Sequence, residues 1–201
     1  MKRKPTPGIR KAMKADRELE EEIERWEVIS FAAAVLAMHR YYGWSDNQLR
    51  GMLRFCAVIT ASCASTTQLS LIQMLDDETG IELQNGDGKS WQELAYLNAS
   101  LKPGQQMTTS QWIYMRNRQK KWVEPQLMAC ILLGLHRMKG YGFTSLKRIY
   151  SQIAGIEAEY GWNKDALHAA CLDATGISAV EYINQQVDEL MKEGEDDGQI
   201  S

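Results

Sequence analysis

Two long segments of the chain resemble each other: residues 31–57 read FAAAVLAMHRYYGWSDNQLRGMLRFCA, and residues 128–154 read MACILLGLHRMKGYGFTSLKRIYSQIA. The two copies align without a gap at an offset of 97 residues and share seven identities in 27 positions. The identical pairs are Ala32/Ala129, Leu36/Leu133, His39/His136, Arg40/Arg137, Gly43/Gly140, Leu49/Leu146 and Ala57/Ala154. Such self-similarity is typical of a duplicated structural unit.

Each copy has the pattern of two helices joined at a glycine. Gly43 follows a long apolar helical pattern and is expected to adopt the left-handed conformation that ends helices. Ser45 and Gln48 then form the pattern of a capping box. We therefore expect helices at about residues 8–42 and 46–62.

The likeness of the two halves continues beyond these segments. LDDETGI at 75–81 is matched by CLDATGI at 171–177, and a second capping pattern, Ser90 with Glu93, is matched by Ser178 with Glu181. Only four prolines interrupt the chain, and no alternating β-pattern is present. The sequence therefore predicts an all-α fold of two tandem, pseudo-symmetric four-helix repeats joined by a basic aromatic connector helix.

The expected organisation has five parts. They are a charged N-terminal helical arm at 1–24, a first repeat at 25–101, a connector at 102–124, a second repeat at 125–193 and a disordered acidic tail at 194–201. The first repeat contains a third helix, capped by Thr67 and ending at Gly80, and a fourth at about 91–101. The connector contains a helix from Thr109 to about Val123.

Composition excludes several classes of protein. The 201 residues carry a net charge of −3, which argues against a protein that coats nucleic acid non-specifically. No apolar run approaches the roughly 20 residues of a membrane span, and the basic N-terminus lacks the apolar segment of a secretory signal. The cysteines have no zinc-site spacing and are expected to be reduced core thiols; they are Cys56, Cys63, Cys130 and Cys171.

The repeated His-Arg-x-x-Gly-aromatic pattern admits two interpretations. His39 and His136 are candidates for general bases or metal ligands, but no carboxylate or nucleophile stands at a matching spacing. The other interpretation is capping, in which His and Arg bind the last helical carbonyls and the glycine reverses the chain. We favour capping, and we expect no enzyme, no cofactor and no metal.

The glycine corners also resemble a helix-turn-helix. Gly43-Trp44-Ser45-x-x-x-Leu49 has the spacing of such a turn, and the following helix would present Arg50 and Arg54 to DNA. However, His39 occupies a position that usually holds a small residue in DNA-binding turns, and the second copy has Gly142 in place of Ser45.

The connector helix combines four cations with three aromatic rings between residues 112 and 122. These residues are Trp112, Tyr114, Arg116, Arg118, Lys120, Lys121 and Trp122. Such a mixture can hold phosphates and stack bases, or form a protein-binding hot spot. The alternative is an amphipathic connector with Trp112, Met115 and Trp122 facing inward. We select this segment as the leading functional surface, because a duplication alone does not require it.

The repeated pattern A-x-x-L-x-x-H-R-x-x-G-[WY], followed by D-x-T-G-I, resembles small helical proteins from the early regions of phages and prophages of gut Firmicutes. Gly140-Tyr141-Gly142-Phe143 and Glu78-Thr79-Gly80-Ile81 carry that likeness. Some early phage proteins of similar size, helical content and mild acidity are anti-CRISPR proteins. The resemblance implies a non-enzymatic phage protein in the cytoplasm of a bacterial host, with no membrane association.

The leading functional hypothesis is therefore an inhibitor that binds a host protein or ribonucleoprotein, with the type II CRISPR nuclease as the suspected partner. It would block DNA engagement or cleavage. Acidic segments, Glu18–Glu24 and Asp188–Asp197, could meet the nuclease's basic channel, or residues 112–122 could contact its nucleic acid. The alternative is a helix-turn-helix-like DNA-binding regulator of the phage. Apolar faces left by the duplication would be closed within one chain or in a homodimer.

Overall fold

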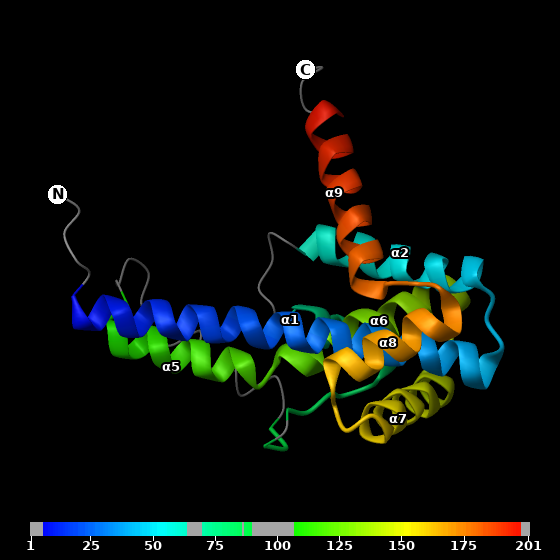
Figure 1. The fold of residues 1–201 in the computed structure, drawn as a ribbon, viewed down its shortest axis with the longest axis horizontal. Coiled ribbons are helices and arrows are strands. Elements are labelled where there is room, and N and C mark those ends of the chain that lie inside the picture. The colour runs from blue at the N-terminus through cyan, green and yellow to red at the C-terminus, as the bar shows by residue number, and fades with distance from the viewer. Residues whose placement is uncertain (1–5, 64–69, 86, 90–106, 198–201) are drawn as a thin grey trace.

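The computed structural model describes residues 6–63, 70–85, 87–89 and 107–197, and every regular element within these ranges is an α-helix (Figure 1). The helices are α1 Pro7–Tyr42, α2 Asp46–Cys63, α3 Ser70–Thr79, α5 Thr109–Lys120, α6 Val123–Lys139, α7 Phe143–Glu159, α8 Lys164–Thr175 and α9 Ala179–Asp197. The all-α prediction is confirmed. The helix expected at 91–101 and the cap expected at Thr67 lie outside the described residues.

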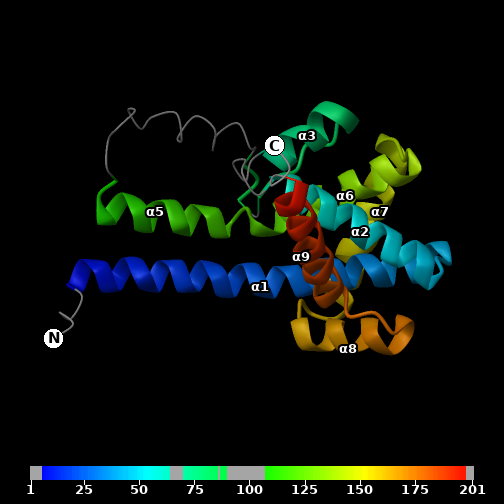
Figure 2. The ribbon, with the colours of Figure 1, turned by 90° about the horizontal axis from the view of Figure 1, so that it is seen from above.

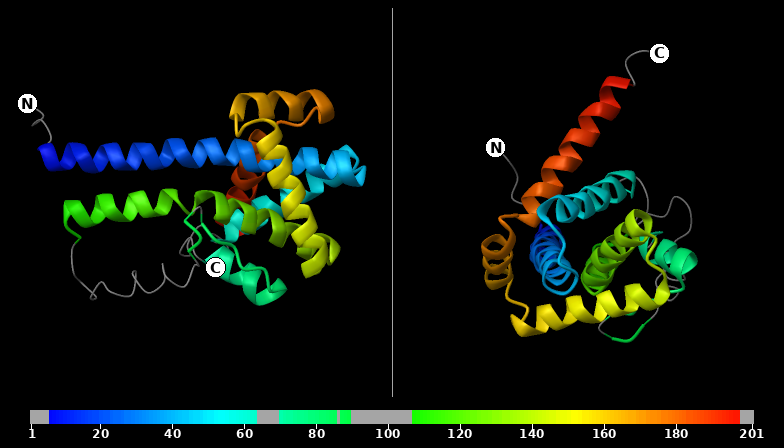
Figure 3. Two further views of the ribbon diagram at one scale, coloured as in Figure 1. Left: turned by 90° about the horizontal axis from the view of Figure 1, so that it is seen from below. Right: turned by 90° about the vertical axis from the view of Figure 1, so that its right-hand side faces the viewer.

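The body is built around α1 and α6, which lie side by side and run in the same direction (Figures 2 and 3). In the view along these two helices, α2 and α7 cover opposite sides of the pair. Helix α2 packs on α6, and α7 packs on α1. Helix α8 packs on α1, whereas α3 packs on α6. All six helices contribute to one continuous apolar core.

Helix α1 changes character halfway along its 36 residues. From Ile29 to Met38 every residue is buried, and most are alanine or branched aliphatic residues. In the N-terminal half only Ala15 and Leu19 are buried. That half extends beyond the body beside α5, so α5 and the start of α1 form a projecting two-helix arm (Figure 2).

The two glycine corners have closely similar geometry. Gly43 and Gly140 adopt left-handed conformations, with φ of 62° and 67°. Their N–H groups donate to the carbonyls of His39 and His136 at 3.1 and 2.7 Å. Each histidine Nδ1 lies within hydrogen-bond distance of the carbonyl oxygen of the residue that follows the glycine. The distance is 3.3 Å from His39 to Trp44 and 2.8 Å from His136 to Tyr141. The histidines therefore bind across the corner, rather than to the last helical carbonyls as we expected.

Helices α3 and α8 also end alike. Thr79 and Thr175 donate their hydroxyls to the carbonyls four residues earlier, at 2.6 and 2.8 Å. Each hydroxyl also accepts the N–H of the isoleucine two residues later, at 3.3 Å. Gly80 and Gly176 follow in left-handed conformations. The Thr-Gly-Ile triplets are therefore helix-ending devices.

Two helix ends differ from the sequence-based expectations. Helix α5 begins at Thr109, as predicted, with Thr108 as its N-cap, but it ends at Lys120 instead of about Val123, and α6 begins only at Val123. Helix α9 continues to Asp197, past the expected tail boundary at Gly194. A glycine inside a helix costs only about 1 kcal/mol, so good helix formers before it can carry the helix onward.

Three cysteines are buried and reduced, as predicted: Cys56, Cys130 and Cys171. Cys56 and Cys130 face each other where α2 meets α6, and each thiol lies within 4 Å of the other residue's carbonyl oxygen. The helices come close here because Gly134 has no side chain. A Cβ at Gly134 would lie 3.2 Å from the Cys56 sulfur.

Replacing Gly43 with alanine should lower the free energy of unfolding by about 1 kcal/mol, because a Cβ is costly in the left-handed region. No atom lies within 4 Å of the added Cβ, so the effect is backbone strain alone. Gly155→Ala is the matched control. Gly155 is exposed within α7 and also has open space, so this change should stabilise the protein slightly. Urea unfolding measures the free energy of unfolding of both variants. Equal changes in the two variants would contradict the left-handed conformation of Gly43.

Glu157 on α7 is 2% exposed, and its Oε1 has no hydrogen-bond partner among the described residues. Burial, aided by the nearby Glu124 carboxylate, raises the pKa of Glu157 from 4.5 to about 7. The folded state therefore binds the proton more tightly than the unfolded chain. Stability should decline as pH rises from about 4.5 to about 7 and then level off.

Glu157→Gln keeps the shape and removes the charge. Above pH 7 the variant should exceed the parent in free energy of unfolding by about 3 kcal/mol, since each pKa unit corresponds to about 1.4 kcal/mol. At pH 4.5 the two proteins should differ little. Urea titrations at both pH values provide the measurement, and an advantage independent of pH would contradict the burial of this carboxylate.

Candidate nucleic-acid and partner-binding surface

Helix α5 begins with a complete capping box. Thr108 Oγ1 accepts the N–H of Gln111 at 3.3 Å, and Gln111 Oε1 accepts the N–H of Thr108 at 2.9 Å. The helix has no buried residue and packs along the N-terminal half of α1. Its two faces therefore have different surroundings: one meets α1, and the other is open.

The inner face of α5 is held to α1 by polar contacts around Asp16. The Asp16 carboxylate accepts hydrogen bonds from Trp112 Nε1 at 3.0 Å and Arg116 Nε at 2.7 Å. The Arg116 guanidinium also lies 4.3 Å from the centre of the Trp112 ring. Trp112 and Arg116, two predicted contact residues, are therefore engaged within the chain.

The other end of α5 is held in the same way. Lys120 Nζ lies 2.6 Å from Glu18 Oε2, and this hydrogen bond and charge lower the pKa of Glu18. Lys121 forms an ion pair with Asp87. Three of the four connector cations are thus neutralised by acidic groups of the same chain.

Arg118 differs from the other three cations. Among the described residues no carboxylate lies within ion-pair distance of its guanidinium. Its contacts are with Tyr114: a hydrogen bond of 3.5 Å to the phenol oxygen, and a position 5.7 Å from the ring centre. The Tyr114 side chain is 57% exposed. These two residues define what we call the open face of α5.

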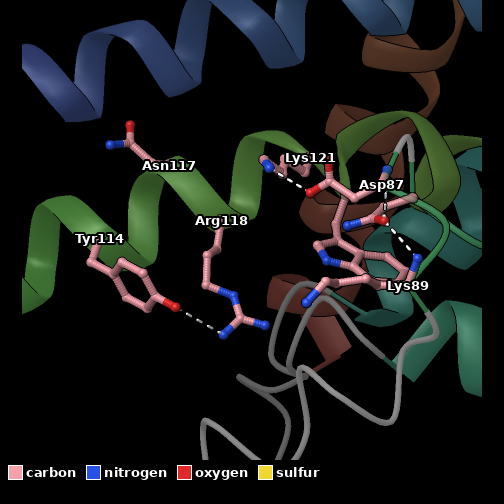
Figure 4. A pocket seen from close by; sticks show the side chains of 8 residues that line it. Asp87, Lys89, Tyr114, Asn117, Arg118 and Lys121 are labelled. Carbon is pink, nitrogen blue, oxygen red and sulfur yellow. Dashed lines mark hydrogen bonds and ion pairs between the residues drawn. The ribbon is translucent and has the colours of Figure 1, made fainter.

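The open face borders a cavity of about 380 Å³ (Figure 4). Its lining residues are Asn85, Asp87, Lys89, Tyr114, Asn117, Arg118, Lys121 and Trp122. The figure shows Tyr114 and Arg118 on one side, with Lys89 and the Lys121–Asp87 pair on the other. A smaller cavity of about 240 Å³ is lined by Glu22, Trp26, Asp87, Lys120, Lys121 and Glu124.

Asn85 organises the turn that supplies Asp87 and Lys89 to the cavity. Its Oδ1 accepts the N–H groups of Asp87 and Lys89, both at 3.0 Å. The place of this turn beside α5 was not expected from the sequence. Asp87 and Lys89 are therefore site residues that sequence reasoning missed, since nothing local links them to a helix more than 20 residues away.

Trp122 is 2% exposed and belongs to the core, where it precedes α6. The amphipathic-connector interpretation placed it inward, and the structure does the same. Trp112 and Met115 are half-buried. Of the predicted set, Tyr114 is exposed, Arg118 is half-buried but has no carboxylate partner among the described residues, and Lys121 is exposed but paired.

Arg50 and Arg54 are not brought to this surface, because they lie on α2 in the body of the molecule. The Arg50 guanidinium lies 5.3 Å from the Tyr182 ring of α9, and α9 packs along α2. Arg54 is exposed. A helix that enters a DNA groove must be open along its outer side, so α9 restricts this use of α2.

The acidic segment of α1 is extensively paired. Its ion pairs are Lys14–Glu18, Arg17–Glu21, Arg25–Glu22 and Lys164–Glu24. These contacts, together with Lys120–Glu18, offset much of the negative charge that we expected to be available to a basic partner.

Across the described part of the chain, no group of three or more His, Cys, Asp or Glu side chains is placed to hold a metal ion. The described helices include none with the length and apolar character that a membrane span requires. Comparison of the chain with family models, curated proteins and solved structures gives no match.

The Asp16–Arg116 contact should stabilise the arm measurably. A double-mutant cycle of Asp16→Asn and Arg116→Gln should give a coupling free energy of about 0.5–1 kcal/mol, since the pair is partly buried and hydrogen-bonded. The control pair, Arg17 and Glu21, has side chains that are 69% and 64% exposed. Its coupling should be about 0.3 kcal/mol. Equal coupling energies by urea unfolding would argue against the docked arm.

Proposed function

We propose that this protein is a non-enzymatic phage inhibitor that binds a host defence complex and acts as an anti-CRISPR protein on the type II RNA-guided nuclease. The observation that carries the proposal is the open face of α5. An exposed Tyr114 and an Arg118 without a described carboxylate partner stand beside a cavity, on an arm that projects from the body. Aromatic and arginine side chains dominate the binding energy of many interfaces.

The relation of α5 to the rest of the fold supports a dedicated role. We infer that the body consists of two tandem units, at residues 25–101 and 125–193. In support, α2 packs on α6 as α7 packs on α1, and α3 packs on α6 as α8 packs on α1. The glycine corners and the Thr-Gly-Ile helix ends also have matching hydrogen bonds. Helix α5 lies outside both units, so the duplicated body does not require it.

The alternative functions receive less support. For a DNA-binding regulator, Arg50 would have to leave Tyr182, and α2 would have to reach DNA beside α9. For an enzyme, His39 and His136 would act through Nε2, since each Nδ1 contacts a backbone carbonyl. Among the described residues, neither histidine belongs to a group of side chains placed to hold a metal ion. The resemblance to early phage proteins and the open face of α5 both favour a binding protein.

The proposal predicts that the purified full chain forms a stable complex with a guide-loaded type II nuclease and reduces target cleavage. The double substitution Tyr114→Ala with Arg118→Ala should weaken inhibition by tenfold or more, because each side chain of a hot spot contributes more than about 1 kcal/mol. Titration of cleavage rate against inhibitor concentration measures the change.

The matched control is Arg17→Ala on the same arm, which removes an exposed cation paired with Glu21. This variant should inhibit within about twofold of the parent protein, since surface ion pairs contribute little. The proposal is wrong if the parent protein neither binds nor inhibits loaded nucleases. A shift of free duplex DNA at physiological salt that depends on Arg50 and Arg54 would instead establish the regulator.

A further inference from the structure

We infer that the cavity beside α5 binds one nucleotide unit, with its base against Tyr114 and its phosphate on Arg118. This inference rests on the proposed function, because it uses the same surface and identifies the chemistry that the surface recognises. It is carried by three properties of the cavity: its size, its charge and its exposed aromatic ring.

The size suits a small planar ligand with a charged group. The cavity has a volume of about 380 Å³, within the range of roughly 300–1,000 Å³ typical of small-molecule sites. Its lining includes the exposed Tyr114 and the buried Trp122. A nucleotide can therefore enter from the Tyr114 side, either free or as part of a single strand.

The charge selects an anion. Three cationic side chains and one carboxylate line the cavity: Lys89, Arg118, Lys121 and Asp87. The ion pair between Lys121 and Asp87 neutralises one of the cations. Arg118 has only its contact with Tyr114 among the described residues. A guanidinium that has no carboxylate partner can bind a phosphate with two parallel hydrogen bonds without first breaking an ion pair.

The aromatic ring distinguishes a nucleotide from other anions. Tyr114 is 57% exposed, although the guanidinium of Arg118 lies 5.7 Å from its ring centre. Arg118 therefore orders the ring but leaves much of its surface open for stacking. Stacking on an exposed aromatic ring tolerates every base, which suits a site that follows a strand rather than reads its sequence. An acidic peptide would use the cations but would leave the ring without a partner.

The turn that carries Lys89 makes the site preformed. The Asn85 side-chain oxygen holds this turn by accepting the backbone N–H groups of Asp87 and Lys89. The Asp87 carboxylate pairs with Lys121 at the end of α5. The turn is thus attached to the end of the helix that carries Arg118. A preformed site loses little conformational freedom when the ligand binds.

Fluorescence anisotropy of the full chain with a labelled ten-nucleotide thymidine strand tests the inference. The parent protein should bind the strand, and Tyr114→Ala should weaken binding by about tenfold. Arg118→Ala should weaken binding similarly. It should also reduce the slope of the logarithm of the binding constant against the logarithm of salt concentration by about one. A competition experiment adds unlabelled thymidine monophosphate to the complex with the labelled strand. Competition at similar concentrations identifies a free nucleotide as the ligand, whereas weak competition identifies the strand.

The control variant is Phe143→Ala. Phe143 on α7 is 47% exposed and lies 5.6 Å from Lys147, so it forms a similar aromatic–cation pair away from the cavity. Its loss should leave binding unchanged, and thermal melts should confirm that all variants fold. Failure of the parent protein to bind the strand or the nucleotide overturns the inference. Binding that is insensitive to Tyr114→Ala, or preferential binding of polyglutamate, also overturns it.

The inference and the proposed function fail in different ways. Strand binding that depends on Tyr114, without any effect on a loaded nuclease, would support the nucleotide site and contradict the inhibitor. Inhibition of the nuclease without strand or nucleotide binding would support the inhibitor and contradict the nucleotide site.

Discussion

The close packing of α1 against α6 is the constraint on which the rest of the structure depends. The two helices carry small, fully buried residues, including Ala33, Ala34 and Ala37 on α1 and Ala129 on α6. Small side chains let two helices approach, and the remaining helices then find two long apolar surfaces to cover. Gly134 serves the same purpose for α2, whose Cys56 sulfur occupies the space that a side chain would need. Because α1 is longer than the body, its N-terminal half projects and needs a separate partner.

That separate partner is α5, and charge rather than apolar burial holds it. The projecting half of α1 buries only Ala15 and Leu19, so its acidic residues provide the main contacts for α5. This use of charge has a functional consequence. The cations of α5 that face α1 are neutralised, while Arg118 and Tyr114 on the other side remain open. A helix that seemed generally basic from its sequence has a narrow and specific open face.

Local patterns in the sequence predicted the all-α fold and several helix ends, although not the ends of α5 and α9. Gly43 and Gly140, the Thr-Gly-Ile triplets and the Ser45–Gln48 contact follow from hydrogen bonds within a few residues, so their signals are readable in the chain. Contacts between distant segments carried no such signal. Asp16 with Arg116 and Asp87 with Lys121 depend on how helices meet in space. Trp122 likewise has the composition of a contact residue but is buried because α6 begins directly after it.

The central claim is that partners meet the chain at the open face of α5 and not at the glycine corners. Hydrogen–deuterium exchange of the full chain, alone and bound to a guide-loaded nuclease, tests this claim directly. The account predicts slower exchange in Thr109–Lys120 and at Asp87 and Lys89, with α2 and α7 unchanged. Slower exchange confined to Asp46–Cys63 or Phe143–Glu159 would contradict it and would assign recognition to the helices that follow the corners.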